Sequence, residues 1–462
     1  MPDSDIRILE AQAHFSEEHA RAAFKFGNVV ADWITLCHVR VRVQNRRGKV
    51  ADGWGAIFLS YPWAFRDPGV EDHVKDAVMR RVTERFCRRA MDYAAFAHPL
   101  DLFVDLEGDL SAISADICRE AALPTKMPYL GALVCASPVD AAIHDAFGNV
   151  NNIPSYDGYS AEFAGHDLSR HLGDGFRGRY LSDFVREAFS PFVPIFHTVG
   201  GLDALRRSET GADSHDDAHP RALDQWIAQD GVFGFKIKLR GNDIDWDLDR
   251  VLSVYAVAAE TLKPPDPIYL SLDANEQCES PAYMVELLRR LRAVNAPAHD
   301  AVCYLEQPTG RDMQHHRFDM RELSTLKPVF VDESLTTLED MTLALELGWS
   351  GIVLKTCKCH SKDLLLAARA EALGIPYVIQ DLTNPGIALL HSIGLAARLK
   401  PWSGVEANAR QYYPDTSIPE AAVHPHIFRV RDGVATTDSL LGAGLGYQLS
   451  RIDRSIFAQA VQ

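Results

Sequence analysis

Short apolar runs alternate with amphipathic helical stretches along the second half of the chain. Eight runs of strand length cover residues 191–200, 233–239, 267–275, 301–308, 327–334, 350–357, 376–381 and 403–408. The stretches between them carry apolar residues at intervals of three and four, which is the spacing of one helix face. Strands that alternate with helices predict an α/β protein with a parallel (β/α) barrel, whose active site lies at the carboxyl ends of the strands.

The first third of the chain has a different rhythm. Alternating apolar and polar residues predict strands over 35–45 and 50–60 that return beside each other as a meander. Helical spacing predicts helices over 74–95 and 133–150, the second with Ser137 as its N-cap and Pro138 in its first turn. The polar stretch 212–220 is expected to be a solvated loop inside the first barrel unit.

Composition narrows the possible partners. Of 462 residues, 47 are basic and 63 are acidic, and the net charge of -16 argues against nucleic acid and anionic membranes as partners. The start of the chain lacks the basic and apolar regions of a secretory signal, and no apolar run approaches the roughly 20 residues that span a bilayer. With eight scattered cysteines, the sequence predicts a reduced, cytoplasmic protein.

A zinc site is the one metal centre that the cysteines suggest. Cys357, Cys359 and His360 stand close together in the sequence, but no second pair of ligands lies at a usable spacing. A structural zinc site is therefore not expected.

Charged residues close the apolar runs of five successive predicted strands. Lys236 and Lys238 lie two positions apart on strand two, so that both side chains point the same way. A solvated edge strand would explain these two lysines alone. Each of the next four strands also ends in a charge: Asp273, Glu306, Asp332 and Lys355. Because charges are rarely buried unless they are paired or bind a metal, the set indicates a functional centre.

Three carboxylates on three successive barrel strands converge, and they are hard oxygen ligands that suit Mg²⁺. Asp332 is preferred to Glu333 because it directly ends its apolar run and adjacent strand residues point oppositely. The metal would acidify the proton α to a substrate carboxylate by stabilising the enediolate. A lysine accepts that proton only when neutral, and burial and nearby cations lower its pKa. Lys238 is the expected base, and Lys236 the cation that assists it.

The motifs Lys-X-Lys, Asp, Glu-Gln-Pro, Asp-Glu-Ser and Leu-Lys over strands two to six resemble the enolase superfamily. Within it, the chain most resembles the muconate-lactonizing-enzyme-like members of the mandelate racemase/muconate lactonizing enzyme family, which include cycloisomerases, o-succinylbenzoate synthases and dipeptide epimerases. The resemblance implies a modified (β/α)8, or (β/α)7β, TIM barrel with an α+β N-terminal capping domain. The implied parts are a cap over 1–150, a connecting segment over 151–190, the barrel over 191–414 and a C-terminal segment over 415–462 that returns to the cap.

The resemblance also assigns roles. Asp273, Glu306 and Asp332 would hold Mg²⁺, and Lys238 and Lys355 would act as acid and base on opposite faces of the substrate, with Lys236 assisting. The cap would set specificity, with candidates Phe24, Lys25, Phe26 and the stretch from Trp54 to Trp63. Glu406, at the end of strand eight, is a candidate for a hydrogen bond to the enolic oxygen or for a structural salt bridge.

The chain also departs from the family patterns. Gln380 and Asp381 stand where mandelate-racemase-like members carry a histidine, and they match only half of the aspartate pair of dipeptide epimerases; both are substrate-site candidates. The sequence TCKCHSK replaces the glycine pair that commonly follows the strand-six lysine. The subgroup fits, whereas the substrate does not transfer.

The expected function is Mg²⁺-dependent abstraction of a proton α to a carboxylate, with racemisation or epimerisation of a small molecule as the outcome. A homo-oligomer is expected. Two alternatives stay open: a lyase or dehydratase that eliminates from the same intermediate, and a non-catalytic barrel kept as a metal-binding scaffold. A Schiff-base aldolase could also use a barrel lysine, but it has no need of three carboxylates.

Overall fold

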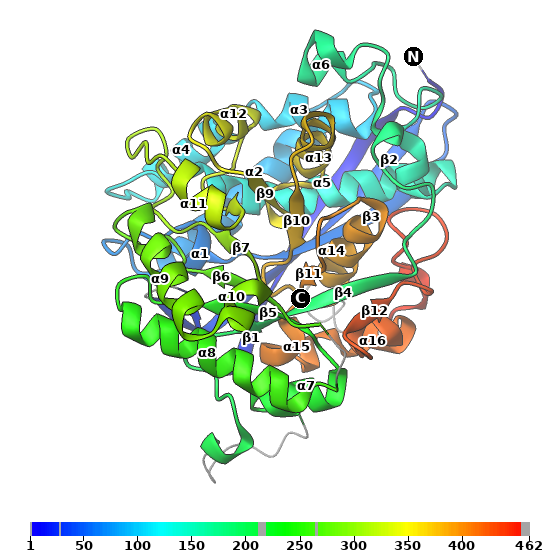
Figure 1. The fold of residues 1–462 in the computed structure, drawn as a ribbon. Helices are drawn as coiled ribbons and strands as arrows, with labels where there is room; N and C mark the ends of the chain where they lie inside the picture. The colour runs from blue at the N-terminus through cyan, green and yellow to red at the C-terminus, as the bar shows by residue number, and fades with distance from the viewer. Residues whose placement is uncertain (1, 27–28, 211–218, 264–266, 454–462) are drawn as a thin grey trace.

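The computed structural model describes residues 2–26, 29–210, 219–263 and 267–453, without the side chains of 22–26 and 29–31 (Figure 1). The loop expected over 212–220 therefore lies largely outside the described residues. Figure 1 shows the N-terminal helices next to the helices of a barrel. Two N-terminal helices, α3 (Pro99–Glu107) and α5 (Tyr129–Asn151), contact the barrel helix α13 (His360–Leu373).

The barrel is closed by eight parallel strands. They are β4 (Phe192–Val199), β5 (Gly234–Lys238), β6 (Tyr269–Asp273), β7 (Val302–Glu306), β8 (Val329–Val331), β9 (Gly351–Lys355), β10 (Tyr377–Gln380) and β11 (Val405–Glu406). Each pairs with the next in sequence, and β11 pairs with β4 to close the ring. A short strand, β12 (Val434–Thr436), adds to β4 in the antiparallel sense. All eight predicted barrel strands are present, and the predicted fold is confirmed.

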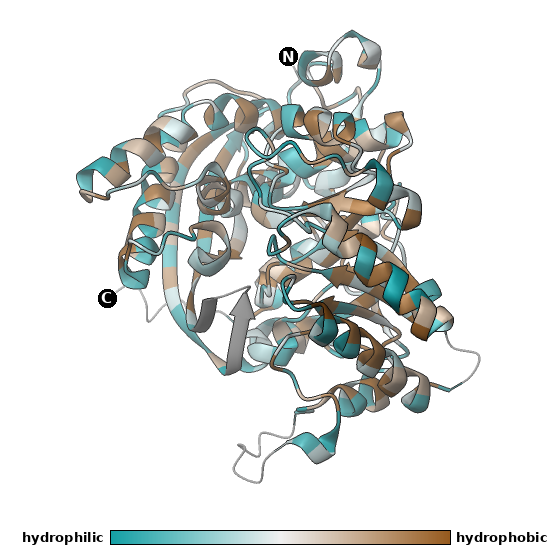
Figure 2. Cartoon of the chain, turned by 60° about the vertical axis from the view of Figure 1, so that its left-hand side comes forward, coloured by the Kyte–Doolittle hydropathy of each residue, from teal (hydrophilic) through white to brown (hydrophobic). Residues whose placement is uncertain are grey.

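Helices follow the barrel strands on the outside. They are α7 (Leu223–Asp230), α8 (Ile244–Thr261), α9 (Pro281–Val294), α10 (Ala296–Ala301), α11 (Arg321–Leu326), α12 (Leu338–Glu346), α13 (His360–Leu373) and α14 (Gly386–Arg398). Figure 2 shows hydrophobic and hydrophilic residues mixed along the outer helices, as amphipathic packing requires. After the barrel come α15 (Ala409–Tyr412), α16 (Ile418–Val423) and α17 (Pro425–Phe428).

The N-terminal part is an antiparallel sheet covered by helices. The sheet consists of β1 (Ile6–Phe26), β2 (Val29–Asn45) and β3 (Val50–Phe58), and the helices are α1 (Tyr61–Ala64), α2 (Asp72–Met91), α3 (Pro99–Glu107), α4 (Leu110–Glu120) and α5 (Tyr129–Asn151). The strands predicted at 35–45 and 50–60 pair as β2 and β3. The long strand β1, which pairs with β2, is absent from the sequence-based prediction.

The predicted start of the helix at 133–150 is wrong. Helix α5 begins at Tyr129 and runs through Pro138. Proline has no N–H to donate to the carbonyl four residues earlier, which is that of Val134. The Ser137 hydroxyl donates to this carbonyl at 2.9 Å, so that Ser137 satisfies the acceptor that Pro138 leaves open.

By length and composition, α5 could cross a bilayer, contrary to the expectation from sequence. The whole of its most apolar window is buried inside the molecule, as in the core helix of a soluble protein. The C-terminal segment contacts α5: the backbone amide of Leu445 donates a hydrogen bond to Asp145 Oδ1 at 2.8 Å. The domain boundaries given above remain predictions.

Two glycines of β3, Gly53 and Gly55, let this strand approach α5 closely. The close approach at Gly55 leads to a prediction about stability. A Cβ on Gly55 would lie 2.1 Å from the carbonyl oxygen of Pro138, which is backbone and cannot rotate away. We expect Gly55→Ala to lower the free energy of unfolding by about 3 kcal/mol, measured by urea denaturation. Gly175→Ala is the control, since no heavy atom lies within 4 Å of its added methyl group. Equal unfolding midpoints for the two variants would contradict this close packing.

Candidate active site

The two lysines of β5 are buried inside the barrel. Every residue of β5 is buried, so the solvated-edge explanation for Lys236 and Lys238 fails. In the barrel register, Lys238 lies beside Asp273 of β6, which in turn lies beside Glu306 of β7. These side chains therefore meet at the carboxyl ends of neighbouring strands.

Lys236 is the hub of this centre. Its Nζ donates to Glu306 Oε1 at 2.7 Å, to Glu406 Oε2 at 2.9 Å and to Gln380 Oε1 at 3.0 Å. It also lies 3.2 Å from Asp273 Oδ2. Burial acts to lower the pKa of Lys236, but the surrounding carboxylates outweigh burial and raise that pKa well above its usual value. Lys236 is therefore a fixed cation whose donors are all engaged.

Two lysine–aspartate pairs flank the hub. Lys238 Nζ on β5 donates to Asp273 Oδ2 on β6 at 2.6 Å. Lys355 Nζ on β9 donates to Asp332 Oδ2, just after β8, at 2.6 Å. Because β7 lies between β6 and β8, the three carboxylates predicted as metal ligands occupy successive strand ends between the two lysines. The structure thus brings together all six residues that the sequence placed at the centre of the site.

The carboxyl groups differ in proton affinity. Burial acts to raise the pKa of Asp273, but Lys238 and Lys236 outweigh it and hold that pKa at about 2. The pKa of Asp332 is likewise depressed against the effect of burial, by Lys355 and Lys358. Glu306 has the opposite balance: burial, with Asp273 and Asp332 nearby, raises its pKa to about 8 although Lys236 opposes the shift. Glu306 therefore keeps a proton to a higher pH than a free carboxyl group does, and a cation bound beside it would favour its ionised form.

The donor set fits a divalent cation in chemistry and in charge. The buried carboxyl groups are Asp273, Glu306, Asp332, Glu333, Asp381 and Glu406, and the buried ammonium groups are Lys236, Lys238, Lys355 and Lys358. When all of them are ionised, the carboxyl groups outnumber the ammonium groups by two, which is the charge of one Mg²⁺ ion, and hard oxygen donors are what Mg²⁺ prefers. Within the described ranges, no three acidic, histidine or cysteine side chains already stand around one point, because here ammonium groups lie between the carboxylates.

Of the other candidate residues predicted from the sequence, some lie in the charged centre and others do not. Gln380 bridges the hub, since its Nε2 donates to Glu306 Oε2 at 2.6 Å. Glu406 accepts from Lys236 and from Thr198 Oγ1, the latter at 2.6 Å. Asp381 is buried, with Oδ2 unpartnered. Lys25 belongs to β1, but its side chain lies outside the described residues, like those of Phe24 and Phe26. Trp54 lies half-buried on β3.

Trp63 brings the N-terminal part into the site. Its Nε1 donates to Glu333 Oε1 at 2.9 Å, and Lys355 Nζ lies 4.7 Å from the centroid of its ring. The backbone carbonyl of Trp63 accepts from Arg311, which also binds Glu276 after β6. The indole is therefore fixed against the lysine on the β9 side of the centre.

Two residues of the centre, Glu333 and Lys358, are not among the residues predicted from the sequence. Strand alternation sets Glu333 aside, but β8 ends at Val331, so alternation no longer governs Asp332 and Glu333. Burial, with Asp332 and Glu276, raises the pKa of Glu333 to about 7. Lys358 donates to Asp332 Oδ1 at 2.9 Å. A further basic residue so soon after a buried strand is the signal that could have indicated it.

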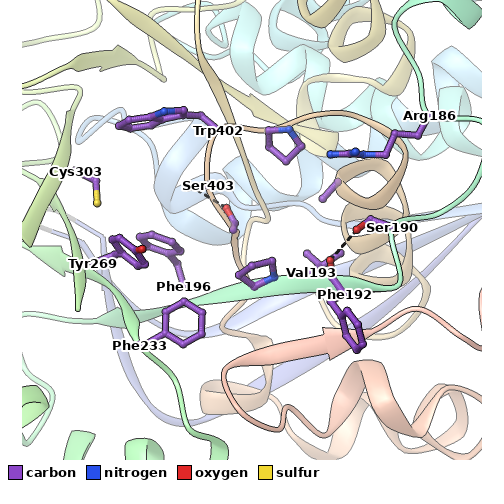
Figure 3. A pocket seen from close by; sticks show the side chains of 14 residues that line it. Arg186, Ser190, Phe192, Val193, Phe196, Phe233, Tyr269, Cys303, Trp402 and Ser403 are labelled. Carbon is purple, nitrogen blue, oxygen red and sulfur yellow. Dashed lines mark hydrogen bonds between the residues drawn. The ribbon is translucent and has the colours of Figure 1, made fainter. Parts of the chain in front are cut away.

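A separate cavity lies at the other end of the barrel (Figure 3). It has a volume of about 520 Å³, and its aromatic lining consists of Phe192, Phe196, Phe233, Tyr269 and Trp402. Phe192 and Tyr269 begin β4 and β6, whereas Asp273 ends β6 and Lys238, Glu306 and Lys355 end their own strands. Since barrel enzymes work at the carboxyl ends of the strands, this cavity is not the catalytic pocket.

Comparison with known proteins supports the family resemblance that the sequence motifs indicate. A family model described as enolase C-terminal domain-like matches residues 219–452. The N-succinylamino acid racemase of Thermus thermophilus is 28% identical over 233 residues, which cover 49% of this chain and 56% of that protein. The chain therefore matches little more than half the length of this curated relative.

Solved structures show the same fold. The dipeptide epimerase of Enterococcus faecalis V583, solved with Mg and the dipeptide L-Leu-L-Tyr, has a TM-score of 0.61 at 17% identity, covering 95% of this chain and 99% of that one. The muconate lactonizing enzyme of Pseudomonas fluorescens, solved with muconolactone, has a TM-score of 0.59 at 19% identity, covering 98% of both chains. The resemblance seen in the motifs is thus confirmed by the family match, and the chain belongs to the enolase superfamily, with a barrel of the enolase C-terminal domain-like family.

Proposed function

We propose that this protein is a divalent-cation-dependent enzyme that removes and returns the proton α to a carboxylate, acting as a racemase or epimerase of a small carboxylic acid. The observation that carries the proposal is the order of side chains around the barrel. Lys238 and Lys355 stand on either side of three carboxylates on the intervening strands. A planar intermediate above the carboxylates would have one lysine on each face.

Asp273, Glu306 and Asp332 are the residues that would hold the cation. When bound, Mg²⁺ supplies positive charge that makes the proton α to a coordinated carboxylate more acidic. The dipeptide epimerase of similar fold was solved with Mg, which supports the choice of metal. The excess of buried carboxyl groups over buried ammonium groups supports it independently, because a bound cation would keep those carboxyl groups ionised.

The lysines differ in what they can do. Lys236 is engaged by four side chains and stays charged, so its role is to hold Glu306, Glu406 and Asp273 in place. Lys238 and Lys355 each donate to one carboxylate, which leaves N–H groups for a substrate. Burial acts to lower the pKa of Lys355, but Asp332 outweighs it and raises that pKa. Lys355 therefore stays protonated and releases its proton reluctantly, so it would exchange protons with a substrate only after another cation engages Asp332 and weakens this ion pair.

Isomerisation is preferred to elimination because both faces carry a lysine. A racemase needs an acid and a base on opposite sides of one carbon, whereas an elimination can proceed with one base. The relatives named above, a racemase, an epimerase and a lactonizing enzyme, support the same choice. A lyase acting through the same intermediate is the second candidate. A homo-oligomeric state and a cytoplasmic location remain predictions.

The test is exchange of the α-proton in D₂O. N-acyl amino acids, dipeptides and acid sugars are incubated with the protein and Mg²⁺, and loss of the α-proton signal is followed by NMR. We expect exchange with one class, and we expect a chelator to abolish it and added Mg²⁺ to restore it. Exchange that persists in the chelator would overturn the metal requirement and favour a Schiff-base lysine. No exchange with any class would favour a non-catalytic scaffold.

A further inference from the structure

Lys358 places a further ammonium group on a proposed metal ligand. It lies in the short turn after β9, and its side chain folds back toward the end of β8. Its Nζ donates to Asp332 Oδ1 at 2.9 Å and to the backbone carbonyl of Asp332 at 2.6 Å. A longer contact of 3.4 Å reaches the carbonyl of Val353. An ammonium has three N–H groups, so these three acceptors use all of them.

Buried contacts of the residues that follow Lys358 hold it in position. The next residue, Cys359, is buried and has φ of +83°, in the region that non-glycine residues rarely adopt. Helix α13 then begins, and Ser361 in its first turn binds the Asp140 carboxylate of α5 through both its amide and its hydroxyl, each at 2.8 Å. Tyr159 also bonds to His360 at 2.9 Å. These buried contacts hold the turn in its unusual conformation.

Lys358 and Lys355 divide the Asp332 carboxylate between them. Lys355 binds Oδ2 and Lys358 binds Oδ1, so both oxygens of a proposed metal ligand carry an ammonium partner. Lys355 has N–H groups left for a substrate, whereas Lys358 has none. Lys358 therefore cannot serve as a proton donor to substrate from this position, and its effect must pass through Asp332.

We propose that Lys358 is a positioning residue that orients the Asp332 carboxylate and, through its charge, lowers the affinity of the centre for divalent cations. The proposal rests on the proposed function, because it takes Asp332 as a metal ligand. A weaker site would keep the metal exchangeable and would leave the carboxylates ion-paired until cation and substrate arrive together. Lys358 would thus set the Mg²⁺ concentration at which the enzyme works.

Two effects oppose each other when Lys358 is removed. Residues that orient a metal ligand are worth about 10- to 100-fold in metal affinity, and losing one weakens binding. A cation within a few ångströms of a carboxylate changes its affinity for a proton by about 10- to 1,000-fold, and a divalent ion experiences twice that effect on a logarithmic scale. The charge effect is the larger one. Removing the ammonium should therefore tighten Mg²⁺ binding.

The test is the dissociation constant for Mg²⁺, measured by titration calorimetry on the full chain without substrate. We expect Lys358→Met to lower this constant at least tenfold, since it removes the charge and keeps much of the volume. Lys358→Gln should also lower it, because it removes the charge but keeps an N–H donor. Lys400→Met is the matched control: it removes a half-exposed lysine bound to Glu371, and should leave the constant unchanged.

The outcomes separate this proposal from the proposed function. Mg²⁺ binding by the wild type with equal or weaker binding by both Lys358 variants would overturn the role of Lys358 and leave the function intact. Binding that only the variants show would support the proposal in its strongest form. If neither wild type nor variants bind Mg²⁺, the metal assignment and this proposal fall together. If Lys358→Met does not fold, as judged by circular dichroism, the comparison of Lys358→Gln with wild type decides.

Discussion

Glu306→Gln is expected to abolish α-proton exchange and to weaken Mg²⁺ binding by more than about 100-fold, because residues that merely orient a ligand are already worth 10- to 100-fold. Glu306 is the central carboxylate of the three, and Lys236 and Gln380 fix its two oxygens. The substitution keeps the shape of the side chain and removes its charge. Calorimetry with Mg²⁺ and NMR in D₂O are the measurements.

Folding has to be separated from metal binding, and the three ligand variants differ in this respect. In Glu306→Gln, Lys236 keeps Glu406 and Asp273 as partners, so no lysine is left without a counter-charge. Asp332→Asn instead strips Lys355 of the one carboxylate that it contacts directly, and breaking such a buried pair costs about 3–5 kcal/mol. We therefore expect Asp332→Asn to lose stability as well as metal, whereas Glu306→Gln should lose metal affinity with a near-native melting temperature.

Glu333→Gln is the matched control, because Glu333 is a buried carboxyl group adjacent to Asp332 and faces Trp63. The Mg²⁺ affinity of the Glu333→Gln variant should stay within about tenfold of wild type, as expected when the replaced group is not a metal ligand. Unchanged affinity in Glu306→Gln, Asp273→Asn and Asp332→Asn together would remove the metal assignment. A large loss in Glu333→Gln alone would move the third ligand from Asp332 to Glu333.

The barrel could be predicted from sequence because its strands carry two signals at once. Each is a short apolar run, and five successive strands have a charge at or next to the carboxyl end, where a barrel concentrates its function. Periodicity says less about the N-terminal sheet, since β1 mixes polar and apolar residues over 21 positions and owes its form to pairing with β2. The start of α5 is mispredicted because Ser137 and Pro138 look like a helix start, while tertiary burial carries the helix through them.

The ion pairs of the site could not be predicted from knowing which residues end the strands. Sequence order says which strand a residue follows, but not that Lys236 reaches past β4 to Glu406 on β11. Nor does it show that Lys358, three residues past Lys355, turns back to the same aspartate. Both contacts depend on side-chain reach in three dimensions. Trp63 shows the same limit, because its contact with Lys355 joins segments separated by almost three hundred residues.

The two flanking lysines should each serve one enantiomer of the substrate. Lys238 on β5 and Lys355 on β9 approach from opposite sides of the carboxylates, so each reaches one face of a planar enediolate. Losing a positioned acid or base typically costs about 10²- to 10⁴-fold in rate. We expect Lys355→Ala to lose net racemisation by that factor, yet to keep exchanging the α-proton of the enantiomer whose hydrogen faces Lys238. Lys238→Ala should show the reverse preference.

NMR of each enantiomer with each variant in D₂O, at matched Mg²⁺, measures this directly. Lys400→Ala is the control for loss of one positive charge and should behave as wild type, since its ammonium contacts Glu371 and is half exposed. If Lys355→Ala keeps full racemisation, Lys355 only balances Asp332, and a lyase with Lys238 as its single base becomes the better assignment. If both variants lose exchange of both enantiomers, the two lysines act as one electrostatic unit, and the assignment of one lysine to each face fails.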